Sequence, residues 1–106
     1  MIDLAVMPLE RFQASAVEAA RLLKALSNDK RLMILCQLGG GERAVGELIP
    51  LVGLSQSALS QHLAVLREEG LVATRREGVS IRYRIADPAV VKIIAALAEI
   101  YCPPEA

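Results

Sequence analysis

Two cysteines, Cys36 and Cys102, carry the only thiols of the 106-residue sequence. A thiol transferase would need a base beside its nucleophile or a Cys-x-x-Cys pair, and the sequence has neither arrangement. The glycine run at 39–41 lacks the lysine of a phosphate-binding loop. We therefore expect no enzyme, and the rival interpretation is a thiol or persulfide transferase that uses Cys102. If each cysteine is considered alone, Cys36 is expected to be a small apolar residue of the core, and Cys102 is expected to be a terminal thiol without a role.

The sequence offers few ligands for a metal ion, because it holds one histidine, His62, besides two thiols that are far apart in the chain. Soft metals need clusters of thiolate or imidazole groups, so we expect neither a metal nor another cofactor. Two cysteines are too few for the disulfide scaffold of a small secreted domain. No apolar run reaches the ~20 residues of a membrane span, and the N-terminus has an early acid, Asp3, and no basic region. These features predict a cytoplasmic protein that contacts no membrane.

Small hydrogen-bonding side chains at 56–67 are suited to contact DNA. If these residues form a helix, Ser55 precedes it as the N-cap. The outer face of the helix then consists of Gln56, Ser57, Ser60, Gln61, Ala64 and Arg67. Glutamine bonds adenine edges, serine bonds bases or phosphates, and alanine permits close approach, whereas a merely solubilising face favours Glu and Lys. The pattern predicts a recognition helix in the major groove of double-stranded DNA. His62 falls on the inner side, where we expect a packed, hydrogen-bonded histidine.

Residues 71–86 supply positive charge beside this helix. They contain one glutamate, Glu77, and four arginines, a local net charge of +3: Arg75, Arg76, Arg82 and Arg84. The whole chain has 12 basic and 12 acidic residues, which excludes a uniformly basic surface. We predict that the four arginines contact phosphates or the minor groove. The alternative is a solvated hairpin whose charges only prevent edge-to-edge aggregation.

The elements that position these residues follow from periodicity and from helix-capping residues. Helices are predicted at about 9–26, 28–38 and 45–52, and from Ser55 to about residue 69. Strands at 71–76 and 80–85 flank a turn at Glu77-Gly78, and Asp87 caps a last helix at 88–102. The order of four helices, a hairpin and a helix predicts a mainly helical winged helix-turn-helix. We expect one domain, 1–106, with an ordered core at about 9–102.

The sequence has more apolar surface than one small core can bury. Apolar residues make up 54% of the chain and aromatic residues only 3%. The last predicted helix has two adjacent apolar stripes, namely Val90/Ile94/Leu97/Tyr101 and Val91/Ala95/Ala98/Cys102. A domain of this size buries roughly 60–65% of its unfolded surface, so a second subunit is the expected cover. Part of the first stripe also fits an intramolecular core.

Two motifs resemble the ArsR/SmtB-type bacterial repressors. The DNA-binding signature is Ser57-x-x-Ser60-x-His62-Leu63-x-x-Leu66-x-x-x-Gly70-Leu71-Val72, and the entry to the second helix is Leu26-Ser27-Asn28-Asp29-Lys30-Arg31-Leu32-x-Ile34-Leu35. The resemblance spans about residues 15–102 without a gap. It implies a homodimer that pairs through its first and last helices, with each recognition helix in a major groove of an inverted-repeat operator.

Members of this family differ in the signal that they sense, and the sequence can be compared with the metal-sensing and the dithiol members. Ile49 and Leu51 stand where arsenic sensors place paired cysteines, and the last helix has only Asp87 and Glu99 where zinc sensors place acids and histidines. Ile34-Leu35-Cys36 and Ile100-Tyr101-Cys102 instead resemble the dithiol subgroup that senses persulfides or oxidants. That resemblance implies a repressor switched by reactive sulfur species through a disulfide or polysulfide bridge between Cys36 and Cys102. The alternatives are a constitutive or anti-silencing DNA-binding regulator with structural cysteines and, less expected, a metal-sensing repressor.

Overall fold

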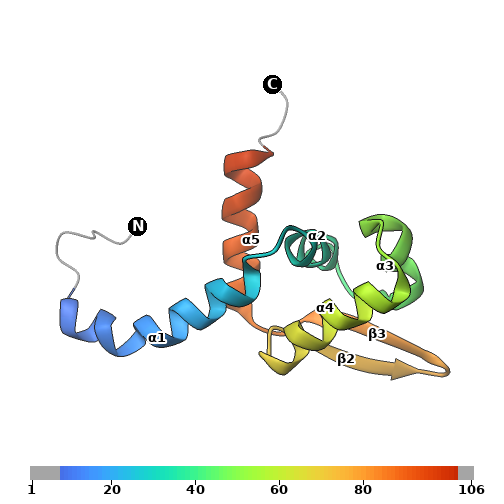
Figure 1. Cartoon of the computed structure of the whole chain (residues 1–106), viewed down its shortest axis with the longest axis horizontal. Coiled ribbons are helices and arrows are strands. Elements are labelled where there is room, and N and C mark those ends of the chain that lie inside the picture. Colours follow the sequence, from blue (N-terminus) through green and yellow to red (C-terminus); the bar gives the residue numbers. More distant parts are fainter. Residues whose placement is uncertain (1–7, 103–106) are drawn as a thin grey trace.

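The computed structural model describes residues 8–102 of the chain, so residues 1–7 and 103–106 of the predicted 1–106 domain lie outside the described part. Five helices and three strands follow in the order α1 (Leu9–Leu26), α2 (Asp29–Leu38), β1 (Arg43–Ala44), α3 (Val45–Val52), α4 (Gln56–Glu68), β2 (Val72–Glu77), β3 (Ser80–Ile85) and α5 (Pro88–Tyr101). This order confirms the predicted winged helix-turn-helix (Figure 1).

Polar side chains fix where three of the helices begin. Asn28 accepts hydrogen bonds from the backbone N–H groups of Lys30 and Arg31, so α2 begins at Asp29, one residue later than predicted. The predicted caps Ser55 and Asp87 are confirmed, because each side chain accepts a backbone N–H of the helix that follows it. Each cap satisfies a donor that the first helical turn leaves without a partner.

The sheet has one strand that the sequence pattern did not indicate. Its order is β1-β3-β2, and β1 pairs Arg43 with Tyr83 and Ala44 with Arg82 in an antiparallel register. The predicted turn at Glu77-Gly78 is wrong by one residue, because Glu77 pairs with Ser80 and the turn consists of residues 78 and 79. Gly78 has a φ of 62°, which suits the first central position of a tight hairpin turn.

The core lies around α2, which packs against α1, α3, α4, α5 and β3. Ile34 and Leu35 of α2 are fully buried, as are Leu48 of α3 and Leu59 of α4. Val90 is the one fully buried residue of α5, and Ile94 packs half-buried against the core, so the first predicted stripe of α5 is intramolecular in part, as expected. The core therefore holds α2 and the helix-turn-helix (α3 and α4) as one unit.

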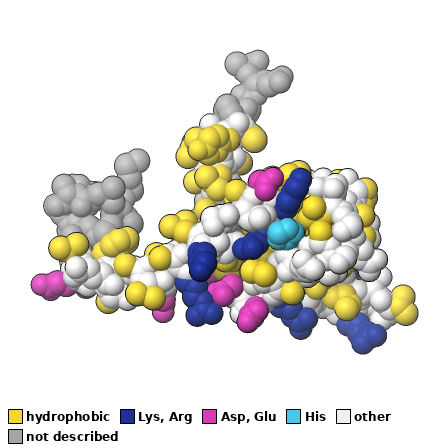
Figure 2. All heavy atoms as spheres, viewed as in Figure 1, with side chains coloured by type: hydrophobic (Ala, Val, Ile, Leu, Met, Phe, Trp, Pro, Cys, Tyr) yellow, Lys and Arg dark blue, Asp and Glu magenta, His cyan; other side chains and the backbone are white. Residues whose placement is uncertain are grey.

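Helices α1 and α5 project away from this core (Figure 1). The radius of gyration is 15.7 Å, larger than the roughly 13 Å expected of a compact chain of this length. Hydrophobic side chains are exposed along both helices (Figure 2), and the larger ones are Leu9, Phe12, Val17, Leu23, Val91, Ile100 and Tyr101. Apolar surface of this extent is typical of an interface.

Candidate functional site

Helix α4 presents the predicted DNA-reading face to solvent. Leu59, Leu63 and Leu66 anchor its inner side in the core. The polar residues of the predicted outer face are all exposed: Gln56, Ser57, Ser60, Gln61 and Arg67. Ser55 is exposed as well, and its hydroxyl oxygen accepts the Ala58 N–H at 3.1 Å. Its own O–H remains available to donate, which is the bond that a phosphate oxygen accepts.

His62 connects α4 to α2, as the sequence predicted for a packed, hydrogen-bonded histidine. Arg31 of α2 donates from Nε to His62 Nδ1 at 3.4 Å, and from Nη1 to the Ala25 carbonyl at 3.0 Å. One guanidinium thus joins the end of α1, the start of α2 and the recognition helix. Arg31 is therefore a direct polar contact between α2 and the DNA-reading element.

The wing, defined as β2 and β3, places its arginines on two faces. Arg75 and Arg82 are cross-strand partners, and Arg84 shares their face because strand residues alternate. Arg76 lies on the opposite face, paired with Ile81, and its Nε donates to the Gly78 carbonyl. Among the described residues, Arg76 and Arg84 take part in no salt bridge.

Two of the wing arginines are neutralised from outside the hairpin. Arg75 contacts Glu42 at 2.5 Å and Glu77 at 2.7 Å, and Arg82 contacts Glu42 at 3.0 Å and Glu47 at 3.4 Å. The hydrogen bond from Arg75 holds the pKa of the Glu42 carboxyl below its ordinary value. The positive charge expected from residues 71–86 alone is therefore partly compensated, because Glu42 and Glu47 reach the hairpin from a distant part of the sequence.

Replacing Glu42 with glutamine is expected to tighten DNA binding by about threefold to tenfold, because it frees Arg75 and Arg82 for phosphates. The salt dependence should steepen by up to about 0.9 in log–log slope for each new phosphate contact. Fluorescence anisotropy titrations between about 50 and 200 mM salt measure both quantities. Glu10→Gln, which removes the same charge in the first turn of α1, is the matched control. Weaker DNA binding by Glu42→Gln would mean that Glu42 supports the wing rather than competing with DNA.

Both cysteines line a second site. A cavity of about 230 Å³ between α2 and α5 is lined by Leu32, Met33, Cys36, Ile94, Leu97, Ala98, Tyr101 and Cys102. Both thiols are free and exposed, so the interpretation of Cys36 as a core residue is wrong. Cys36 lies on the outward side of α2, whereas Ile34 and Leu35 face the core. Cys102 follows the last residue of α5, one position beyond the helix, and its N–H donates to the Ala98 carbonyl at 2.7 Å.

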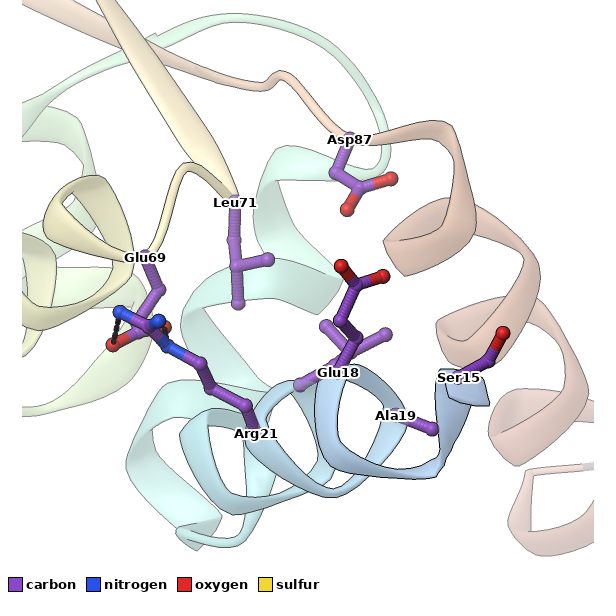
Figure 3. A pocket seen from close by; sticks show the side chains of 8 residues that line it. Ser15, Glu18, Ala19, Arg21, Glu69, Leu71 and Asp87 are labelled. Atoms are coloured by element: carbon purple, nitrogen blue, oxygen red, sulfur yellow. Dashed lines mark hydrogen bonds and ion pairs between the residues drawn. The ribbon is translucent and has the colours of Figure 1, made fainter. Parts of the chain in front are cut away.

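A larger cavity of about 550 Å³, lined by both charged and apolar side chains, lies between α1, the end of α4 and the start of α5 (Figure 3). Arg21 of α1 bonds both carboxylate oxygens of Glu69, at 2.6 and 3.3 Å, and the Glu18 and Asp87 carboxylates face each other across the opening. Glu69 raises the pKa of Arg21, and Asp87 is engaged in capping α5. These polar groups connect α1 to the end of the recognition helix.

Two further features of residues 8–102 concern metal ions and membranes. No three His, Cys, Asp or Glu side chains of this range gather where they could hold a metal ion. None of the described helices has the length and apolar character needed to cross a membrane. The positions noted for metal sensors hold Ile49, half-buried on α3, and Leu51, exposed on the same helix.

Comparison with known proteins adds to this geometry. The family described as "Bacterial regulatory protein, arsR family" matches residues 28–74. The HTH-type transcriptional regulator YgaV of Escherichia coli K12 is 52% identical over 90% of this chain and 97% of its own. The transcriptional repressor BigR of Xylella fastidiosa has a solved structure with a TM-score of 0.85 and 45% identity, covering 91% of this chain and 98% of BigR. Reduced HlyU of Vibrio cholerae N16961 gives a TM-score of 0.84 at 46% identity, covering 89% and 99% of the two chains. The chain therefore belongs to the arsR family of bacterial regulatory proteins and is a DNA-binding transcriptional regulator.

Proposed function

We propose that the protein is a dimeric cytoplasmic repressor whose affinity for DNA falls when reactive sulfur species or oxidants join Cys36 to Cys102. One observation carries the proposal: these cysteines, one in α2 and one just after α5, line the same cavity between the two helices. The cytoplasm keeps thiols reduced, so the unbridged protein is its resting state there. The solved relatives include a repressor, BigR, and a regulator described in its reduced form, HlyU.

A second copy of the chain is the partner that covers α1 and α5. Their exposed side chains, among them Phe12, Leu23 and Ile100, have no cover within the described chain. Twofold pairing through these helices presents two α4 helices to one side of a duplex. Half-sites in an inverted repeat then lie about one helical turn, ~10 bp, apart.

DNA contacts in this dimer come from the exposed face of α4 and from the wing. The residues are Ser55, Gln56, Ser57, Ser60, Gln61, Arg67, Arg75, Arg76, Arg82 and Arg84. The glutamines and serines of α4 contact base edges, and the arginines contact phosphates. Arg75 and Arg82 exchange their Glu42 partner for phosphate when the wing meets the duplex.

The bridge forms in two balanced steps. One cysteine thiolate attacks the outer sulfur of a persulfide R–S–SH, which gives Cys–S–SH and releases the thiolate R–S⁻. The second thiolate attacks the inner sulfur, which closes the disulfide and releases HS⁻. The two thiols are oxidised and the persulfide is reduced. One further persulfide adds one sulfur to the bridge and releases one more thiolate.

Bridge length can distinguish the inducers. A direct disulfide requires Cα atoms within about 7 Å, whereas a trisulfide or tetrasulfide spans a wider gap without displacing the backbone. A peroxide can supply only the direct bond. Closing either bridge ties α5 to α2 and restricts their relative motion, and the contact of Arg31 with His62 connects α2 to α4.

Mass spectrometry of the persulfide-treated protein tests the chemical step. We expect a Cys36–Cys102 cross-link within a single chain. The mass of that chain should fall by two hydrogen atoms and rise by one sulfur atom for each sulfur inserted in the bridge. The Cys36→Ser and Cys102→Ser variants should yield only uncross-linked single chains. An unmodified Cys36 or Cys102 in the treated protein would defeat the proposal and favour a constitutive regulator with structural cysteines.

A further inference from the structure

The lining of the cavity between α2 and α5 is almost wholly hydrocarbon. Apart from the two thiols, it consists of Leu32, Met33, Ile94, Leu97, Ala98 and Tyr101. No charged side chain lines it, in contrast to the cavity of Figure 3, where Glu18, Arg21, Glu69 and Asp87 gather. The cavity is open to solvent on one side, and a charged group that lies against this lining loses part of its hydration without gaining a partner.

The size of the cavity limits the ligand further. Its volume of about 230 Å³ lies below the ~300–1,000 Å³ typical of sites for drug-sized molecules. A short alkyl chain fits such a space and removes apolar surface from water as it enters. The thiols of Cys36 and Cys102 stand in the same lining, so a sulfur donor held by its alkyl groups is within reach of both.

We propose that this cavity selects the sulfur donor by charge, and that uncharged dialkyl polysulfides are its preferred substrates. The inference rests on the proposed function and specifies the class of inducer. Small sulfur donors that carry carboxylate or ammonium groups react more slowly at this site, because their charges must be desolvated against Leu97 and its neighbours.

The reaction with a dialkyl trisulfide, R–S–S–S–R, balances without another oxidant. One cysteine thiolate attacks an outer sulfur, which forms Cys–S–S–R and releases the persulfide anion R–S–S⁻. The other thiolate attacks the cysteine sulfur of this mixed disulfide, which forms the Cys36–Cys102 bond and releases R–S⁻. The protein loses two electrons and the trisulfide gains them.

The test compares three trisulfides of similar size on the reduced, full-length protein. Dipropyl trisulfide is uncharged, bis(2-carboxyethyl) trisulfide is anionic and bis(2-aminoethyl) trisulfide is cationic. Rates of thiol loss are measured by mass spectrometry and divided by the rates for the urea-unfolded chain, which removes intrinsic reactivity. We expect the folded protein to favour the uncharged reagent over both charged ones by about tenfold or more. Equal normalised rates would overturn the proposal, as would a cation that reacts as fast as the uncharged reagent.

A matched pair of variants places the effect in the cavity. Leu97→Lys should raise the normalised rate of the anionic reagent relative to the uncharged one, whereas Leu97→Gln should change that ratio much less. An unchanged ratio in the Leu97→Lys variant would contradict the proposal.

DNA release is measured separately with the cross-linked protein. If the cross-linked protein releases DNA but the three trisulfides react at equal normalised rates, only this inference is refuted. If the uncharged trisulfide is favoured but the cross-linked protein still binds DNA, only the proposed switch is refuted.

Discussion

Replacing either cysteine with serine is expected to leave DNA binding by the reduced protein within twofold of the original and to abolish the response to persulfide. Cys36 and Cys102 are exposed and outside the core, so serine costs no buried packing. In the unaltered protein, we expect treatment to weaken DNA binding by about 5–150-fold, the range of a coupling free energy of ~1–3 kcal/mol. Anisotropy titrations on an operator selected from a random DNA library measure both states.

Ala96→Ser is the control for this pair of variants. It adds a hydroxyl to an exposed position of the same helix outside the cavity and keeps both thiols. We expect it to retain the persulfide response. If either cysteine variant still releases DNA after treatment, the switch lies elsewhere in the protein.

Replacing Phe12 with aspartate is expected to dissociate the dimer and weaken operator binding by about a hundredfold or more. Phe12 is 48% exposed in the single chain and lies on the same side of α1 as the exposed Leu9 and Leu23, so replacing it with a carboxylate acts mainly on the interface. A monomer loses the gain of binding two half-sites at once, which amounts to roughly 10²–10⁴ in affinity. Sedimentation velocity measures the dissociation, and anisotropy measures the loss of binding.

Val17→Asp is the matched control on the same helix. Val17 is also an exposed apolar side chain, 78% exposed, but it lies about 140° around the helix from Phe12 and about 120° from Leu23, at about 100° per residue, so it is on another side of α1. We expect this variant to remain dimeric and to bind the operator. A Phe12→Asp protein that stays dimeric would show that α1 does not form the interface.

Local patterns predicted most of the fold. The α4 boundaries followed from Ser55 as cap and from Leu59, Leu63 and Leu66 at helical spacing, and the structure confirms all of them in these roles. The inward, hydrogen-bonded position of His62 also followed from its place on the apolar side of that helix, but its partner, Arg31, is distant in the sequence and was not predicted. The cap and the leucine spacing depend on neighbours within a few turns of the chain, which is the range that periodicity reports.

Features that depend on distant partners were missed. β1 has only two residues, and its strand geometry exists because β3 pairs with it. The neutralisation of Arg75 and Arg82 could not be predicted from the hairpin, because Glu42 reaches them from a separate loop. The exposure of Cys36 was missed too, since the nearly continuous apolar run of α2 does not reveal which side faces the core.

The proximity of the two cysteines was expected from family resemblance rather than from periodicity. The side chains that define their cavity come from α2 and α5, which are separated in the chain by the whole helix-turn-helix and the wing. No local pattern reports such a pairing of helices. The apolar character of the lining was equally hidden, because it results from which sides of α2 and α5 remain uncovered.

The affinities of the reduced and the cross-linked dimer for the same operator test the central claim most directly. The cross-linked protein is purified, and mass spectrometry establishes that a single chain carries the Cys36–Cys102 bridge. We predict binding that is about 5–150-fold weaker than that of the reduced dimer, and full recovery after reduction. Equal affinities of the two forms would contradict the account.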